Sequence, residues 1–94
     1  MNSKLRSKET DELFKALSLL ESTDEYYDFF EDLCTVTEIK SLSQRFHVAR
    51  LLSEGKTYLE VGELTGASTA TISRISKCLS YGADGYNLIL KRMK

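Results

Sequence analysis

The sequence TYLEVGELTGASTATISRISKCL, residues 57–79, carries the start and stop signals of two short helices in succession. Thr57 and Glu60 can form a capping box, in which the hydroxyl accepts from the N3 amide and the carboxylate accepts from the cap amide. Gly66 can end this first helix by adopting a positive φ. Ser68 can then cap a second helix. The segment therefore predicts a helix-turn-helix, two short helices joined by a tight turn.

The apolar and small residues of this segment have the spacing that such a helix pair needs. Gly62 is small where the second helix has to approach, and Ile72 and Ile75 place apolar groups on the inner face of that helix. Leu79 extends the same face. Thr65 is the one departure, since a hydrophobic residue is common at that position. The second helix of a helix-turn-helix commonly enters the major groove of DNA.

Charge is divided unevenly along the chain. The 94 residues include 13 basic and 14 acidic side chains, for a formal net charge of −1 at pH 7. Residues 1–35 hold four basic and nine acidic groups, giving −5, whereas residues 36–94 hold nine basic and five acidic groups, giving +4. Phosphate responds to the local field, so the basic half, which contains the helix-turn-helix, remains compatible with DNA.

The fold class expected from the pattern is all-α. The chain has no proline, and its apolar residues recur at helical spacing. Thr23 or Ser22 is expected to cap the second helix, and Thr37 the third. The helices are expected over residues 8–21, 24–34, 37–54, 58–65, 69–80 and 84–93.

The length of the chain predicts one domain over residues 1–94. Within it, residues 57–80 form the helix-turn-helix, and residues 8–54 and 84–93 supply helices for dimerisation. The first two helices bear more large apolar residues than a small monomer can easily bury, which favours a homodimer. The alternative is that these helices simply cover the small core.

The residues offer no constellation for catalysis or for metal binding. His47 is the single histidine, and no glycine-rich phosphate loop or nucleophile elbow is present. Cys34 and Cys78 lack C-x-x-C spacing and are expected to be buried, reduced thiols. We therefore expect no enzyme, no metal and no resident cofactor. Neither a membrane-spanning run nor a secretory signal is apparent, so a cytoplasmic protein without membrane contact is expected.

The second helix of the pair is expected to turn small and basic side chains outward, if its aliphatic residues point inward. Alanine and threonine methyl groups can contact thymine, hydroxyls can bond base edges or phosphates, and basic groups can reach guanine or the backbone. The alternative is that the small residues only allow close helix packing. The candidate DNA-binding residues are Lys56, Thr57, Ser68, Thr69, Ala70, Thr71, Ser73, Arg74 and Lys77.

Two long phrases carry a resemblance to a known family. DLCTVTEIKSLSQRFHVARLLSEGKTY, residues 32–58, and TGASTATISRISKCLSYG, residues 65–82, resemble the tryptophan repressor superfamily, and within it the YerC/YecD-type subgroup. The resemblance covers essentially the whole chain. It implies a six-helix fold, an intertwined homodimer, and sequence-specific binding of double-stranded DNA by the helix after Gly66. The usual role is that of a transcriptional repressor without a catalytic step.

The resemblance also implies a ligand pocket. In the tryptophan-responsive member the indole lies between two arginines, whose positions match Arg45 and Arg74, and Thr35 matches a residue at the pocket mouth. Ile75 stands where that pattern has glycine, and Cys78 where it has serine. A branched side chain would occupy volume that the indole needs, and cysteine is the weaker hydrogen-bonding group. We therefore expect the corepressor to be a different small molecule, or none, rather than tryptophan.

Three functions follow from these observations. The first is a dimeric DNA-binding transcriptional regulator. The second is a repressor that responds to a small molecule, which requires that the ligand bind two states with different affinity. The third is a protein-interaction module that has kept the fold and lost DNA binding, because a fold alone does not prove a function.

Overall fold

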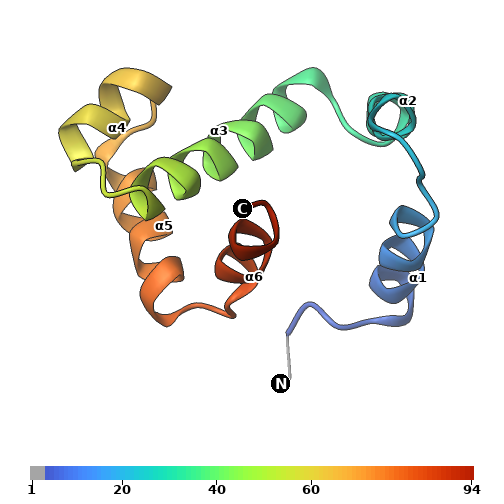
Figure 1. Cartoon of the computed structure of the whole chain (residues 1–94). Coiled ribbons are helices and arrows are strands. Elements are labelled where there is room, and N and C mark those ends of the chain that lie inside the picture. Colours follow the sequence, from blue (N-terminus) through green and yellow to red (C-terminus); the bar gives the residue numbers. More distant parts are fainter. Residues whose placement is uncertain (1–3) are drawn as a thin grey trace. The chain divides into compact units, whose positions relative to one another are not determined.

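The expected all-α architecture is confirmed in a computed structural model that describes residues 4–94 (Figure 1). These residues form two compact units, unit 1 up to Val36 and unit 2 from Thr37 to Lys94. A single domain over the whole chain therefore stays a prediction. The helices are α1 (Lys8–Leu17), α2 (Thr23–Leu33), α3 (Val36–Ser53), α4 (Tyr58–Thr65), α5 (Thr69–Tyr81) and α6 (Gly85–Arg92).

Helix α1 ends at Leu17, four residues before the predicted end at 21. The hydroxyl of Ser18 donates to the carbonyl of Lys15 at 2.6 Å, a local bond that competes with continuation of the helix. Beyond it, the backbone N–H of Glu21 donates to the Glu25 carboxylate at 2.8 Å, and this bond belongs to the start of α2. The residues between α1 and α2 therefore form a turn.

Ser22, rather than Thr23, caps α2, because its hydroxyl accepts from the backbone N–H of Glu25 at 3.2 Å. The prediction that Thr37 caps α3 is wrong. Helix α3 begins at Val36, so Thr37 lies inside it. Cys34 is extended (φ −122°, ψ 157°) and ends α2, so only Cys34 and Thr35 separate the two helices.

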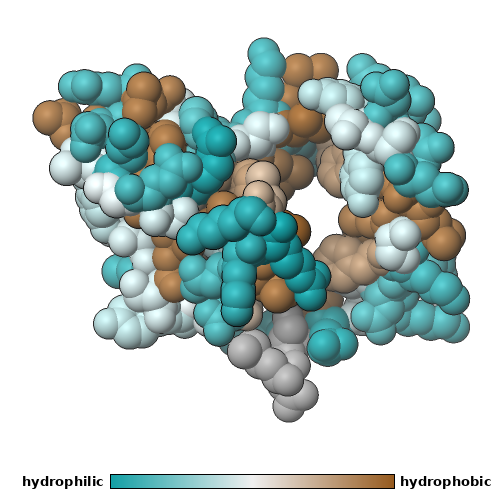
Figure 2. Space-filling model, viewed as in Figure 1, coloured by the Kyte–Doolittle hydropathy of each residue, from teal (hydrophilic) through white to brown (hydrophobic). Residues whose placement is uncertain are grey.

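Unit 1 lacks a buried core among its described residues. Neither α1 nor α2 contains a buried residue, although both are amphipathic. Phe14 is 56% exposed and Tyr27 is 65% exposed. Tyr26 stacks on Phe30 with ring centroids 6.5 Å apart, and that contact covers only part of the aromatic surface. Brown patches over these two helices in Figure 2 show apolar side chains at the surface.

The core of unit 2 joins α3 to both helices of the predicted helix-turn-helix. Val48 of α3 and Val61 of α4 are fully buried, and Ile72 and Ile75 of α5 are each 2% exposed. The inward direction predicted for the two isoleucines is confirmed, whereas Leu79 is only half-buried against the same cluster. Burial of one such side chain stabilises a fold by about 1.5–3 kcal/mol. Helices α4 and α5 therefore both pack against α3.

No helix within residues 4–94 is both long enough and apolar enough to cross a lipid bilayer.

Candidate functional site

The start of α4 is fixed by the predicted capping box. The backbone N–H of Glu60 donates to the hydroxyl of Thr57 at 3.2 Å, and the backbone N–H of Thr57 donates to the carboxylate of Glu60 at 2.9 Å. Hydrogen bonding of the Glu60 carboxylate by the Thr57 backbone N–H, and to a smaller extent by the Thr57 side chain, lowers the pKa of Glu60 below its ordinary value of 4.5. Two backbone donors at the helix start are thereby satisfied.

The turn between α4 and α5 also has the predicted geometry. Gly66 has φ +73°, and its N–H donates to the carbonyl of Gly62 at 2.9 Å, which ends α4. The hydroxyl of Ser68 accepts from the backbone N–H of Thr71 at 3.1 Å and so caps α5. The left-handed conformation at Gly66 costs an L-residue energy that glycine does not pay. This turn sets the direction in which α5 leaves α4.

Thr65 stands where a hydrophobic residue is common in a helix-turn-helix, and its side chain makes polar contacts instead of apolar ones. Its hydroxyl donates to the carbonyl of Val61 at 2.7 Å and accepts from the N–H of Ala67 at 3.1 Å. Its carbonyl accepts from the side-chain amide of Gln44, in α3, at 3.1 Å. Sequence reasoning missed Gln44, since no local pattern links positions 21 residues apart. The turn is thus tied to α3 by a partly buried hydrogen bond.

Fewer residues of α5 are exposed than predicted. Thr71 and Ser73 are half-buried, and the hydroxyl of Ser68 donates to that of Thr71 at 3.0 Å. Seven of the nine candidate DNA-binding residues are exposed, and all nine lie in unit 2. The exposed ones are Lys56, Thr57, Ser68, Thr69, Ala70, Arg74 and Lys77.

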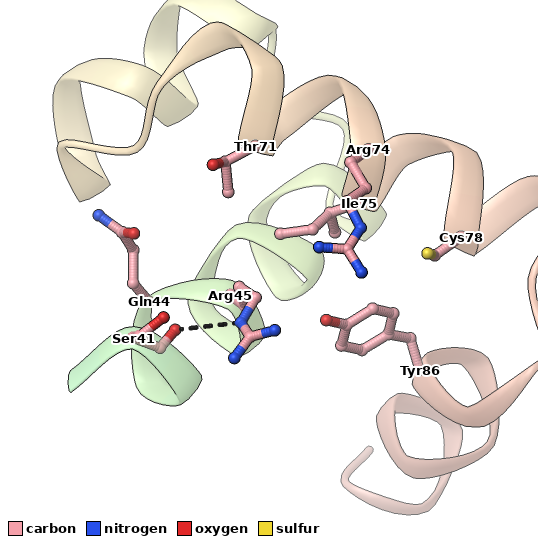
Figure 3. A pocket seen from close by; sticks show the side chains of 8 residues that line it. All are labelled: Ser41, Gln44, Arg45, Thr71, Arg74, Ile75, Cys78 and Tyr86. Carbon is pink, nitrogen blue, oxygen red and sulfur yellow. Dashed lines mark hydrogen bonds between the residues drawn. The ribbon is translucent and has the colours of Figure 1, made fainter. Parts of the chain in front are cut away.

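A pocket of about 300 Å³ lies between α3, α5 and α6 (Figure 3). It brings together four of the five predicted ligand residues, namely Arg45, Arg74, Ile75 and Cys78. Thr35, the fifth, belongs to unit 1 and is not among the lining residues, so its role stays a prediction. Within the pocket, Arg45 Nε donates to the backbone carbonyl of Ser41 at 3.5 Å.

Tyr86 of α6 is the pocket residue that sequence reasoning missed. Figure 3 shows its hydroxyl directed toward the side chains of Arg45 and Arg74. The residue is half-buried and packs against the core of unit 2. No aspartate or glutamate is among the described residues that line the pocket. Two guanidinium groups without a lining carboxylate favour an anionic occupant.

The two cysteines are not bonded to each other, and both are half-buried rather than buried as expected. Cys34 lies in the connection that follows α2, and Cys78 lines the pocket, so each residue is partly exposed. Within residues 4–94, no group of histidine, cysteine, aspartate and glutamate side chains is placed to hold a metal ion.

Known proteins share this sequence and this fold. Residues 8–94 match the family described as Trp repressor protein. An uncharacterized protein, YerC of Bacillus subtilis (strain 168), is 55% identical over 91 residues, which cover 97% of this chain and 88% of YerC. The crystal structure of a TrpR-like protein from Eubacterium eligens ATCC 27750 has a TM-score of 0.92 and 54% identity, covering 98% of this chain and 95% of that one.

A candidate Trp repressor from Staphylococcus aureus, also solved as a crystal structure, has a TM-score of 0.91 and 53% identity, covering 96% of this chain and 90% of that one. The predicted resemblance is thereby confirmed. Because the family match includes all six helices and the relatives are similar over nearly their full lengths, the chain belongs to the Trp repressor family.

Proposed function

We propose that this chain is a sequence-specific DNA-binding transcriptional regulator, acting as a homodimer with α5 in the major groove. The family consists typically of regulators without enzymatic activity. The observation that carries the proposal is the first half of α5, where Thr69, Ala70 and Arg74 are exposed on a helix that a capped turn precedes and whose inner face is buried. Such a helix start can contact base edges while flanking basic groups contact phosphates.

Apolar surface on several helices supports the dimer. Helices α1 and α2 contain no buried residue, and Leu88, Ile89 and Met93 of the α6 region are 52%, 43% and 60% exposed. Burying these groups against a second copy would remove them from water, and two-fold symmetry would place two α5 helices in successive grooves. Light scattering should give the mass of a dimer at micromolar protein concentration, and a monomer mass would refute this assembly.

Selection from random duplex DNA tests the function directly. At about 150 mM salt, where non-specific attraction is reduced, we expect enrichment of a palindrome with half-sites about one helical turn apart. If nothing is enriched, the selection is repeated with metabolites added, tryptophan included. Continued failure would refute DNA recognition and favour the protein-interaction module.

Arg74→Ala is the sharpest variant for the contact itself. If Arg74 reaches a base, affinity for the selected site should fall by about 1–3 kcal/mol, which is about 5- to 150-fold. If it reaches phosphate, the slope of log K against log salt should flatten by about one. Arg6→Ala, which removes an exposed arginine from unit 1, is the matched control. Unchanged affinity of Arg74→Ala at low salt would exclude both roles.

A second candidate function is a response to a small organic anion, favoured by the pocket between Arg45 and Arg74. A ligand there would touch both α3 and α5 and could bias the direction of α5. Thermal unfolding in the presence of candidate carboxylates measures binding, because a ligand of the folded state raises the melting temperature with occupancy. Tryptophan should have little effect on the natural protein and a larger one on Ile75→Gly, in which the branched side chain is removed.

A further inference from the structure

Unit 2 contains a second cleft, separate from the pocket between Arg45 and Arg74. It has a volume of about 770 Å³ and shares no lining residue with that pocket. Its walls come from the end of α3, the start of α4, the second half of α5 and one side of α6. This volume falls within the range of about 300–1,000 Å³ that is typical of small-molecule sites.

Leucines form an apolar floor in this cleft. Leu90 is 8% exposed, and Leu52 and Leu79 pack half-buried against the core of unit 2. The side-chain amide of Asn87 donates to the carbonyl of Leu79 at 2.8 Å, which joins α6 to the end of α5. The floor is therefore held in place by the fold itself, as in most ligand sites.

The rim of the cleft is cationic. Lys56, Lys91 and Lys94 line it and are exposed. No aspartate or glutamate is among the described residues that line it. We propose that this cleft binds an organic anion, a phosphate or carboxylate joined to an apolar group. The apolar group would lie on the leucine floor, and the lysine ammonium groups would surround the anion.

The cleft uses a different side of α6 from the surface proposed for the dimer. Asn87, Leu90 and Lys91 of α6 line the cleft, whereas the exposed Ile89 lies on the opposite side of the helix and Leu88 lies between the two sides.

Amide nitrogen–proton NMR spectra of the full chain, recorded without DNA during titration with naphthyl phosphate, test the proposal. We expect saturable shifts at Leu52, Lys56, Leu79 and Lys91. Inorganic phosphate has the anionic group without the apolar one, and naphthol has the apolar group without the anionic one. Each should therefore bind more weakly than naphthyl phosphate. Shifts confined to the pocket between the arginines, or the absence of saturable shifts, would overturn the assignment. Because no DNA is present, this outcome is independent of the proposed DNA binding.

Lysine variants distinguish binding in the cleft from non-specific attraction between the anion and the basic surface of the protein. Lys91→Gln should weaken binding of naphthyl phosphate about 2- to 5-fold, the effect of losing one exposed charge pair, and adding Lys56→Gln should weaken it further. Arg92→Gln is the matched control, because this exposed arginine neighbours Lys91 and does not line the cleft. An equal loss for Arg92→Gln would overturn the proposal, and unchanged binding in both lysine variants would also do so.

Discussion

Alanine replacement at three glycines should give three different effects on stability, each for a physical reason visible at that position. Gly66 has φ +73° with no heavy atom within 4 Å of an added Cβ, so the substitution introduces backbone strain without a clash. The left-handed conformation costs an L-residue about 1–2 kcal/mol. We therefore expect Gly66→Ala to lower the free energy of unfolding by this amount.

Gly62 and Gly82 test two other effects of alanine on stability, a gain in helix propensity and a clash with backbone atoms. At Gly62, within α4, an added Cβ would lie 3.7 Å from Ile72 Cδ1, an ordinary contact, so alanine should stabilise the helix by about 0.5–1 kcal/mol. At Gly82, φ is −81°, but the Cβ would lie 2.5 Å from the carbonyl oxygen of Cys78 and 2.9 Å from its Cα. Because these are backbone atoms, the end of α5 has to move, and we expect a loss of about 1–3 kcal/mol.

Urea unfolding followed by circular dichroism measures the three effects. All variants are compared at one protein concentration, because the stability of the proposed dimer would depend on it. Gly66→Asn is a matched control, since asparagine adopts positive φ more readily than alanine and should recover part of the loss. The reasoning would be refuted if Gly66→Ala were as stable as the natural protein, or if Gly62→Ala were the more destabilised of the two.

Two further predictions concern the same helix pair. The pKa of Glu60 is lowered in the folded state, so its contribution to stability is complete above its ordinary value of 4.5 and is lost as pH falls through the lower folded value. Glu60→Gln should reduce this acid-dependent loss in unfolding measurements, and an unchanged pH profile would exclude the role. Gln44→Ala removes the donor to the carbonyl of Thr65 and should lower the free energy of unfolding by about 1 kcal/mol. A melting temperature equal to that of the natural protein would show that this bond contributes nothing.

Local signals in the sequence predicted the helix boundaries to within two residues, except at the end of α1. The predicted bounds of α4 are those observed, because Thr57, Glu60 and Gly66 each act on backbone groups within a few residues. The end of α1 was missed because the hydroxyl of Ser18 bonds to the preceding turn, a conformation that competes with the apolar stripe continuing to Leu20.

The sequence by itself determined the fold class, the two short helices with their capped turn, the inward isoleucines of α5 and the family. Hydrogen bonds between near neighbours and helical spacing are sufficient for the first three features, whereas the family followed from the resemblance of residues 32–58 and 65–82 to known sequences. Tertiary structure alone decided that Gln44 holds the turn, that Tyr86 joins Arg45 and Arg74 at one pocket, and that the cleft near Lys91 has a leucine floor. These contacts join helices distant in the sequence, and they form only when α3, α5 and α6 bury their apolar faces together.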